Sequence, residues 1–588
     1  MNGVLNKFRK RNIQTNLYHF ILVIFVVAVS VCLITGLFIN YLTLDKATTN
    51  FFTKSHLPNL IIETDKISAE DEIFFEKYDY GKRMSFNSTF SSGNSEHSAT
   101  IFVSNGKISS PYIIEGSKGS GCFVDSRFVQ KYHLGINYSK ISFEYTIAGV
   151  TKKLEFKVLG SIAMAEELLV DKTCSIFIDE AVFLNALKQS FDGYQDASIS
   201  DLNFNQILIK SEINENDINS IKDYYSSSSS TLEKLTAKDE IESFKALNNE
   251  VRLSKIMLYS FPILFVLISI LVVVSAIGQL VLKERYNIGL LKSLGVSNHE
   301  LVSNYSGYGA FVCFIGAVIG LLVSPLIIPN MTFDVYDTIF NLPRDEVKMI
   351  YPFVLMIGVL VVSIAMGYFS SMFVCLNLTK KTPKECMSQT IKVNLKSKKN
   401  NAKKSIGIIG ESFRNMKINT SRTLMSIVGI FGSSLLCLIG FGVKSALKRN
   451  EATKEFLTIG VFSNIFKIFS LILMLLTILI LIIQIFKERT REIAMLKVNG
   501  ISNGKIWLSI LIEMLFLSAI GFVFACIVCE PIFMLLMKLF GINGKFLIDF
   551  SSFFKTFLIV FGLTFLVALL AVIKLKKLNL ADLIKFSE

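Results

Sequence analysis

Eight long apolar runs divide this sequence, and each is long enough to cross a bilayer core of about 30 Å as an α-helix. The runs cover residues 17–44, 256–282, 305–328, 350–378, 424–443, 461–486, 507–537 and 553–573. Composition agrees with this interpretation, because 51% of the residues are hydrophobic, only 18% are charged and the mean hydropathy is +0.51, which is unusual for a soluble globular chain. The sequence therefore predicts a polytopic α-helical membrane protein with eight spans.

The positions of Lys and Arg predict the orientation of these spans, because cytoplasmic segments carry an excess of both. The basic groups are Lys7, Arg9, Lys10 and Arg11 before the first span, 12 Lys/Arg against two acidic residues in residues 379–422, and Lys574, Lys576, Lys577 and Lys585 after the last span. The first run is too long for the apolar region of a signal peptide and lacks a cleavage site, so it is expected to remain as an anchor. We therefore expect a plasma-membrane protein with both termini in the cytoplasm and with residues 329–349 outside.

Residues 45–253 form a polar segment that is large enough to bury a core of its own. Short or alternating apolar runs predict strands at residues 99–103, 141–147, 154–159, 174–178 and 206–209, and helices at residues 181–190 and 212–224. We predict an α+β extracytoplasmic domain. Five serines at residues 226–230 predict a flexible connection, and residues 232–258 predict a helical stalk that continues into the second span.

The net charge of +14 is distributed unevenly along the chain. Residues 45–252 hold 22 basic and 30 acidic residues, a net charge of −8, so the rest of the chain carries +22. Cytoplasmic segments of a membrane protein require this positive excess. It therefore does not indicate a nucleic-acid partner.

The predicted organisation is a (1+3)+(1+3) duplication in which only the first half has an outer domain. The parts are 1–44 (N-terminal segment and first span), 45–253 (extracytoplasmic domain), 254–378 (spans two to four), 379–423 (basic cytoplasmic linker and the helix before the fifth span), 424–443 (fifth span), 444–460 (short outer loop), 461–573 (spans six to eight) and 574–588 (cytoplasmic tail). Each group of three spans contains a polar cytoplasmic elbow after its first span, at residues 283–300 and 487–506.

The two elbows nearly repeat one another at a separation of 205 residues. When Ile288 is aligned with Ile493, six of eleven successive residues are identical. Apolar residues recur at helical spacing, Gly295 suits a left-handed helix C-cap, and Ser297 with Glu300 forms a capping box for the next helix. Tight turns between membrane helices need such caps in any case. A duplicated string exceeds what a turn requires, so it favours a rigid docking helix at the cytoplasmic face.

At these residues the chain resembles the FtsX-like permease family of ABC transporters, the group of the MacB, LolC and BceB-type permeases. The resemblance rests on Glu284, Arg285, Ile288, Gly289, Lys292, Gly295 and Ser297 in the first elbow, and on Glu488, Arg489, Glu492, Ile493, Lys497, Gly500 and Ser502 in the second. The first elbow is one residue shorter before Ile288. Residues 414–430 look like the family's helix before the fifth span, and Glu513 and Gly521 match positions in the third span of its four-span unit.

The resemblance implies a membrane subunit that binds a separate ABC ATPase, in two copies, through the elbows. Such a subunit converts ATP-driven closure into movement of the outer domain. The sequence contains no G-x-x-x-x-G-K-[S/T] phosphate loop, so ATP is expected on the partner, and no cofactor, metal or enzyme activity is expected in this chain.

Two functions of the outer domain are consistent with this expectation. In the first, the acidic outer domain binds a membrane-active peptide, such as a cationic antimicrobial peptide, or a lipid-linked molecule, and the complex expels it or gives resistance. In the second, the domain is a signalling lever that controls a cell-wall hydrolase or a sensor kinase.

A coupled-ion transporter is disfavoured, because such proteins hold ionisable groups mid-membrane. Only Lys467, Glu513 and Glu530 lie well inside apolar runs here, and Lys555 lies at the start of the last run. An enzyme site is disfavoured as well, since the histidines of the outer domain do not have the spacing of a catalytic motif. Those histidines are His56, His97 and His133.

Among the nine cysteines, Cys526 and Cys529 have C-x-x-C spacing, but no second such pair exists, so a metal site is not supported. Most of the cysteines lie in or beside apolar spans, where a thiol behaves as a small apolar group. Cys122 and Cys174 share the outer domain and could form a disulfide, although their spacing in the sequence does not fix their distance.

Overall fold

The computed structural model divides the chain into two compact units. The described residues are 17–92, 95–117, 119–147, 149–169, 174–191, 195–283, 285–379, 382–387, 410, 412, 414, 416, 420–449, 457–539 and 548–577. The membrane unit comprises Met1–Asn40, Leu253–Thr332 and Tyr351–Glu588, and the α/β unit comprises Tyr41–Arg252 and Phe333–Ile350. The predicted separate domain is therefore present. It contains a second piece of chain, Phe333–Ile350, which we call the docked segment.

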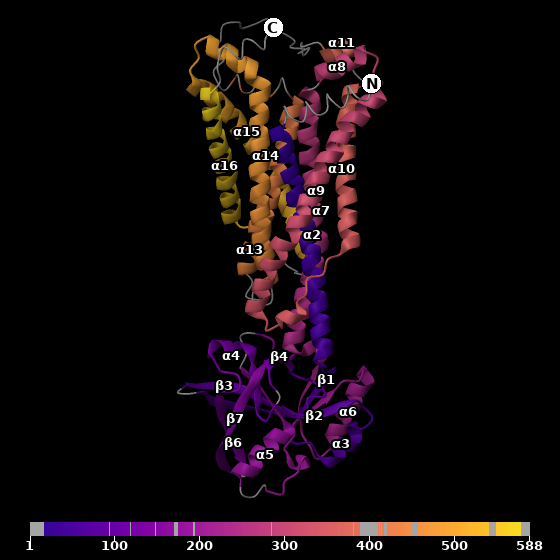
Figure 1. The fold of residues 1–588 in the computed structure, drawn as a ribbon, viewed down its shortest axis with the longest axis vertical. Helices are drawn as coiled ribbons and strands as arrows, with labels where there is room; N and C mark the ends of the chain where they lie inside the picture. The colour runs from indigo at the N-terminus through magenta and orange to yellow at the C-terminus, as the bar shows by residue number, and fades with distance from the viewer. Residues whose placement is uncertain are drawn as a thin grey trace. The chain divides into compact units, whose positions relative to one another are not determined.

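Long helices make up most of the membrane unit. They are α2 (Leu17–Lys54), α7 (Glu242–Lys283), α9 (Asn298–Ile339), α10 (Phe353–Thr379), α13 (Thr420–Arg449), α14 (Leu457–Val498), α15 (Asn503–Leu539) and α16 (Phe550–Lys577), together with the short α8 (Arg285–Ser293) and α11 (Pro383–Met387) (Figure 1). Within the described residues, seven of the long helices are apolar enough to cross a membrane, which confirms a polytopic helical protein. The eighth is α7, which holds the expected second span, and so the count of eight spans stays a prediction.

Glycines let the third long helix of each half lie close to the first. A Cβ atom on Gly316 of α9 would lie 2.8 Å from the carbonyl oxygen of Ile24 in α2. A Cβ atom on Gly521 of α15 would lie 2.9 Å from Cγ2 of Ile430 in α13. Both distances are too short for a side chain, so these helices meet through glycine, as membrane helices often do through small residues. The two glycines are also equivalent when the elbows are aligned.

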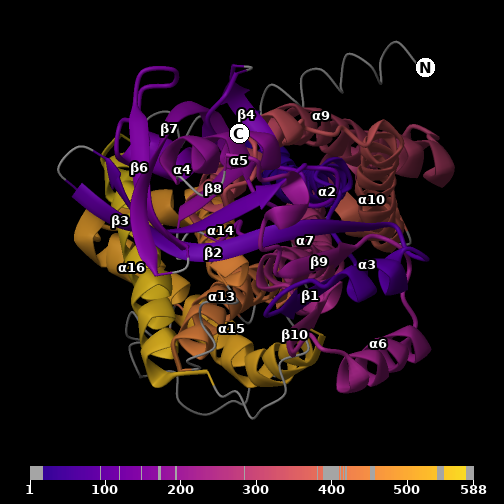
Figure 2. The ribbon, with the colours of Figure 1, turned by 90° about the horizontal axis from the view of Figure 1, so that it is seen from below.

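The α/β unit is built around one sheet, which has ten strands in the part of the chain that the structure describes (Figures 1 and 2). They are β1 (Leu60–Thr64), β2 (Tyr80–Ser92), β3 (Ser95–Ser104), β4 (Tyr112–Gly116), β5 (Cys122–Asp125), β6 (Lys140–Ile147), β7 (Val150–Ala163), β8 (Cys174–Asp179), β9 (Gln206–Ile209) and β10 (Leu232–Ala237). Their order is β10-β1-β9-β2-β3-β8-β5-β7-β4, and β6 pairs with β2 and β7. The pairs β3–β8 and β5–β7 are parallel, and the other pairs are antiparallel.

Short helices cover the two ends of this sheet. They are α3 (Ala69–Phe75), α4 (Ser126–Lys131), α5 (Glu180–Ser190) and α6 (Glu215–Ser227), with 3-10 turns at Ile199–Asp201, Lys238–Glu240 and Arg344–Glu346. In Figure 2, α3 and α6 lie at the β1–β9–β10 end, and α4 and α5 lie at the β7–β8 end. Phe75 and Ile221 bury the first pair of helices against Ile62, and Phe183 of α5 stacks on Phe156 in the second core. Each end thus has its own apolar core.

The expected strands and helices of this unit are all present, but two expectations about its final part are wrong. Residues 232–258 are not one helix, because Leu232–Ala237 form β10 and α7 begins at Glu242. The serine segment is not a free connection, because Ser228 and Ser230 donate to the Asp71 carboxylate at 3.4 and 2.7 Å. Residues 232–237 form a strand because they pair with β1, and the serine segment is held because the buried Asp71 carboxylate accepts its hydroxyl groups. Neither β1 nor Asp71 is close to these residues in the sequence.

Two boundaries of the expected loops also differ. The helix α9 continues to Ile339 through Pro325 and Pro329, so the first half of the expected loop 329–349 is helical. The helix α13 continues to Arg449, into the expected loop 444–460. Most of the linker 379–423 and the tail 578–588 lie outside the described residues.

Cys122 and Cys174 are both free. Strand pairing sets Cys122 of β5 opposite Ile178 of β8, four residues from Cys174, which corresponds to about 13 Å along the strand. Since a disulfide needs Cα atoms within about 7 Å, this register rules out the disulfide that the sequence left open.

Candidate functional site

The first elbow is a helix C-terminus followed at once by a helix N-terminus. At the end of α8, the Val296 amide donates to the Leu291 carbonyl and the Gly295 amide donates to the Lys292 carbonyl, each at 3.1 Å. Gly295 has a φ of +88°. This pair of bonds with a left-handed residue is the Schellman cap, which glycine favours because it has no Cβ. The predicted left-handed cap is confirmed.

A capping box then starts α9. The Glu300 amide donates to Oγ of Ser297 at 3.3 Å, and the Ser297 amide donates to Oε2 of Glu300 at 3.1 Å. Two amides that a helix N-terminus leaves unsatisfied are thereby paired. The direction in which α9 leaves the elbow is therefore fixed by local hydrogen bonds.

The second elbow has the same cap. The Ile501 amide donates to the Leu496 carbonyl and the Gly500 amide donates to the Lys497 carbonyl, each at 3.0 Å, and Gly500 has a φ of +78°. Lys505 takes the place of Glu300, so Ser502 cannot form a box with a carboxylate here.

The helical part of the second elbow is the end of α14, which runs from Leu457 to Val498. The second elbow therefore has no separate short helix like α8, and its helical part is an extension of the span. No cap residue interrupts the chain between the apolar run and the elbow, and so the helix continues.

Each elbow is anchored by one buried isoleucine. Ile288 is fully buried in the apolar core of the first half, and Ile493 is fully buried in that of the second. The neighbouring Gly289 lies under α11, because a Cβ atom there would lie 2.7 Å from Cγ of Met387 and 2.9 Å from Cβ of Cys386. Gly289 therefore packs against this chain and is not free to contact a partner.

The opposite faces of the elbows are exposed and partly apolar. In the first elbow, Tyr286, Leu290 and Leu294 follow one another at intervals of four residues and are 53%, 42% and 69% exposed. In the second, Met495 and Val498 are 55% and 62% exposed. Exposed apolar side chains on rigid helix ends can be covered by a partner.

The remaining predicted residues of the elbows divide into two groups. Lys292 and Lys497 are half-buried, and Ser297 and Ser502 are exposed at their helix starts. Glu284 and the side chains of Arg285, Glu488, Arg489 and Glu492 lie outside the part of the chain that the structure describes. Their roles stay predictions.

A junction in the α/β unit is the second candidate element, and no sequence pattern predicted it. Three pieces of chain meet there: the end of α2, the start of α7 and the docked segment. Their apolar residues form one buried cluster with the sheet, which includes Phe51, Leu247, Tyr336, Phe340 and Leu208. The three pieces that connect this unit to membrane helices are therefore packed into a common core.

A buried ion pair lies beside this cluster. The Arg83 guanidinium donates to both carboxylate oxygens of Glu166, at 3.0 and 2.6 Å. Gln206 and Ser109 accept further bonds from Arg83 at 2.8 and 3.0 Å, and Arg83 is only 1% exposed. With two charges paired and surrounded by hydrogen bonds, the desolvation cost of burial is offset, and the pair fixes the positions of four segments.

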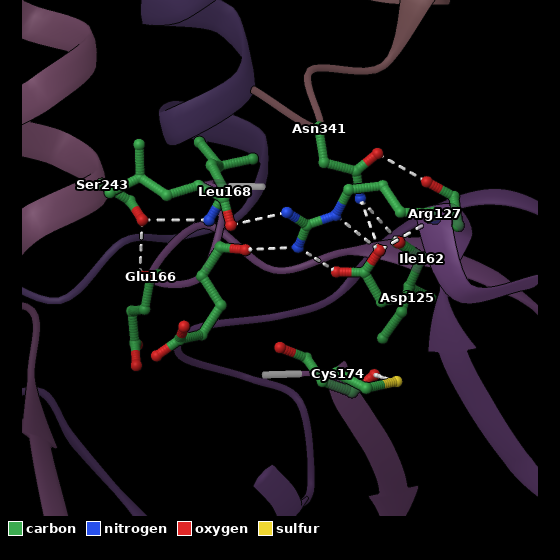
Figure 3. A network of polar contacts seen from close by, with 12 residues as sticks. Asp125, Arg127, Ile162, Glu166, Leu168, Cys174, Ser243 and Asn341 are labelled. Atoms are coloured by element: carbon green, nitrogen blue, oxygen red, sulfur yellow. Dashed lines mark hydrogen bonds and ion pairs between the residues drawn. The ribbon is translucent and has the colours of Figure 1, made fainter. Parts of the chain in front are cut away.

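The loop after β7, which contains Glu166, also binds the first turn of α7. Ser243 donates to the carbonyl of Glu166 at 2.7 Å and accepts from the amide of Leu168 at 3.0 Å (Figure 3). Asn341 of the docked segment donates its amide N–H to the carbonyl of Leu168 at 2.9 Å. The loop after β7 therefore binds α7 and the docked segment at neighbouring residues.

A second polar cluster secures the docked segment to α4. The Arg127 guanidinium binds both oxygens of Asp125, at 2.9 and 2.5 Å, and donates to the carbonyl of Leu169 at 2.6 Å (Figure 3). Asn341 donates to Oδ1 of Asp125 at 3.1 Å and accepts from the hydroxyl of Ser126 at 2.5 Å. Both polar groups of the Asn341 side chain are therefore hydrogen-bonded, one to the Asp125 carboxylate and the other to the Ser126 hydroxyl.

A third contact lies further along the docked segment. Lys54 of α2 and the hydroxyl of Tyr112 donate to Oε1 of Glu346 at 2.5 and 2.6 Å. The hydrogen bonds from Lys54 and Tyr112 lower the pKa of Glu346. Burial, reinforced by the bond to Glu346, raises the pKa of Tyr112 to about 12. The carboxylate form of Glu346 is therefore the one that holds the segment.

This junction could not be predicted from the sequence, for a physical reason. Arg83, Glu166 and Asn341 lie far apart in the sequence, and none belongs to a motif or a periodic pattern. The sequence predicted only that residues 329–349 lie outside the membrane, and it indicated no partner for them.

Comparison with known protein families gives one match, found twice. The model described as FtsX-like permease C-terminal matches residues 259–383 and, separately, residues 464–580. Each match contains one elbow and the helices on both sides of it. Residues 41–252 lie outside both matches. No curated protein matches the chain.

Proposed function

Because this chain belongs to the FtsX-like permease family, we propose that it is the membrane subunit of an ABC transporter and works with a separate ATPase. The observation that carries the proposal is the pair of elbows. Both lie inside the matched domains, both end in the same left-handed glycine cap, and both expose apolar side chains. ATP binds to the partner, since this sequence has no phosphate loop.

The ATPase dimer binds one elbow with each copy. A repeated element on a single chain suits a partner with two-fold symmetry, which presents the same surface twice. The exposed stripe Tyr286–Leu290–Leu294 and the pair Met495–Val498 supply apolar anchors at the two contacts. The rigid caps keep these anchors in place when the partner moves.

Closure of the ATPase is transmitted to the α/β unit through continuous helices. The helix α9 starts at the capping box of the first elbow and ends at Ile339, two residues before Asn341. The helix α7 starts in the α/β unit at Glu242 and ends at Lys283, just before α8. Movement at one elbow thus reaches the buried junction along two helices. The second half has no such connection in the described residues, so it serves as the fixed counterpart.

The work done by the α/β unit is the expulsion of a membrane-active peptide or a lipid-linked molecule. The net charge of −8 over residues 45–252 supports a cationic peptide. Regulation of a cell-wall hydrolase or a sensor kinase is the second candidate. It is supported by the junction, because a rigidly held domain can act as a lever without carrying cargo.

A reconstitution experiment tests the central claim. We expect the purified chain alone to hydrolyse no ATP, and to form a stable complex with its cognate ATPase at two ATPase copies per chain. Native mass spectrometry gives the ratio, and phosphate release gives the turnover. ATP hydrolysis by the isolated chain, or a complex that forms equally well after both elbows are deleted, would contradict the proposal.

A further inference from the structure

Three lysines surround a polar cavity in the α/β unit. The cavity has a volume of about 260 Å³ and is lined by Lys46, Asn50 and Lys54 of α2 and by Asp345, Glu346 and Lys348 of the docked segment. The Ile350 amide donates to Oγ1 of Thr43 at 3.0 Å, which holds the two pieces of chain beside one another. The cavity is therefore a fixed feature of the unit.

The charges around the cavity are not balanced by one another. Lys54 is paired with Glu346, and that carboxylate also accepts from Tyr112. Among the described residues, Lys46 and Lys348 take part in no ion pair, and both are exposed. Asp345 is the one remaining carboxylate of the lining. With Glu346 neutralised by Lys54, two ammonium groups face one carboxylate, and the cavity carries a net positive charge.

The sequence places this cavity at the edge of the membrane. Lys46 is two residues after Leu44, the last residue of the first apolar run, a rise of about 3 Å along a helix. Lys348 is five residues before Phe353, where α10 begins. Lysines at this depth meet the headgroups of phospholipids.

We propose that this cavity is a binding site for the phosphate of a membrane phospholipid headgroup. Lys46 and Lys348 bind the phosphate oxygens as compact cations, and the Asn50 amide donates a further hydrogen bond. The lipid becomes a third member of the contact between α2 and the docked segment. Its headgroup then stabilises the junction at the side that faces the bilayer.

The test uses the full chain in a phosphate-free maltoside detergent, with ³¹P NMR line broadening as the readout. The probes are short-chain phosphatidylglycerol and short-chain phosphatidylcholine, each below its micellar concentration, and inorganic phosphate. We expect phosphatidylglycerol to bind roughly tenfold more tightly than phosphatidylcholine, and K46Q/K348Q to remove this preference. The control K66Q/K222Q removes the same charge from exposed lysines elsewhere in the unit and should bind like the wild type.

Each outcome decides the question. Loss of the preference in K46Q/K348Q with retention in K66Q/K222Q supports the site. Equal loss in both double variants means a diffuse charge effect and overturns it, as does unchanged binding in K46Q/K348Q. Inorganic phosphate that binds as tightly as phosphatidylglycerol overturns the lipid as the source. The assay contains no ATPase, so its failure leaves the proposed function standing.

Discussion

Gly295 and Gly500 are the two residues whose backbone conformation ends the elbow helices. Their φ angles of +88° and +78° lie in the region that side chains with a Cβ avoid. Nothing lies within 4 Å of a Cβ atom placed on either residue. A substitution at these sites therefore strains the backbone without any steric clash, and it tests the conformation of the cap alone.

We expect Gly295→Val and Gly500→Val each to destabilise the cap by about 1 to 2 kcal/mol, because a β-branched residue resists positive φ. Membrane insertion should be normal, and stimulation of the ATPase should fall. Gly500→Asn should keep most of the stimulation, since asparagine tolerates this conformation. Gly504→Val is the matched control, because Gly504 lies in open space without a positive φ. An equal loss in Gly504→Val would show that the cap is not the cause.

A second test on single residues concerns the buried ion pair between Arg83 and Glu166. Glu166→Gln leaves the buried guanidinium without its counter-charge, so the α/β unit should lose about 3 kcal/mol or more. The double variant R83M/E166Q should recover much of this loss, because no unpaired charge remains. Hydrogen exchange of the β2 and β9 amides measures both effects. A double variant no more stable than Glu166→Gln would show that the charge is not what matters.

The docked segment is the element that most changes the interpretation of the chain. A loop of this length between two membrane helices needs no partner. Here it is held by buried Tyr336 and Phe340, by both polar groups of Asn341, and by Glu346. Because the docked segment begins with the last turns of α9, the first elbow and the α/β unit are connected by one helix.

If the docked segment stays fixed during the cycle, a disulfide between Ser126→Cys and Asn341→Cys should leave ATPase stimulation intact. The hydroxyl and amide oxygens of these residues are 2.5 Å apart, so their side chains can reach one another. Asn341→Ala, which only loosens the contact, should reduce the stimulation. The cross-linked protein is compared before and after reduction. Stimulation that appears only after reduction would mean that the segment has to leave the domain.

Glu346 makes a different contact of the docked segment, the one with Lys54 and Tyr112, dependent on pH. Its pKa is lowered in the folded chain, so protonation favours the undocked state, and the stabilisation is present above the ordinary pKa of a glutamate and is lost as pH falls through the lowered value. Exchange of the Phe340 amide, corrected for its intrinsic rate, should therefore rise in acid. Glu346→Gln should show faster exchange at neutral pH and little further change in acid. A pH response that persists in Glu346→Gln would assign it to another group.

At the scale of the whole molecule, one half of the chain carries the α/β unit, and the described residues of the other half form only helices and their connections. The family match falls on both halves, so the common part is the elbow with its helices and the α/β unit is the addition. We propose that the α/β unit and the elbows lie on opposite sides of the membrane, because the apolar run 256–282 separates residues 45–253 from the first elbow.

A thiol-labelling experiment checks this topology. A cysteine at Ser229, which is exposed in the α/β unit, should react with an impermeant reagent in intact cells. A cysteine at Lys577, at the end of α16, should react only after the cells are permeabilised, because basic residues mark the cytoplasmic side. Labelling of Lys577→Cys in intact cells would reverse the proposed orientation.

The sequence by itself determined whatever depends on neighbours along the chain. Apolar runs of about 20 residues predicted the membrane helices. Short apolar runs predicted the strands of the α/β unit, and of these residues 174–178 and 206–209 are buried throughout, whereas burial alternates along β6. The cap at Gly295 and the box at Ser297 were predictable, since their hydrogen bonds close within six residues. The duplicated elbows and their resemblance to the FtsX-like family came from the same local signal.

Only the tertiary structure decided how distant segments share partners. The sequence predicts that Ser230 belongs to a flexible serine run, yet its hydroxyl donates a hydrogen bond to the Asp71 carboxylate, which holds it in place. The sequence predicts that Asn341 belongs to an outer loop, yet hydrogen bonds to Asp125 and Leu168 hold it on the α/β unit. In each case the partner lies more than 150 residues away, and the free energy of the contact comes from a donor, an acceptor and burial that exist together only in the folded chain.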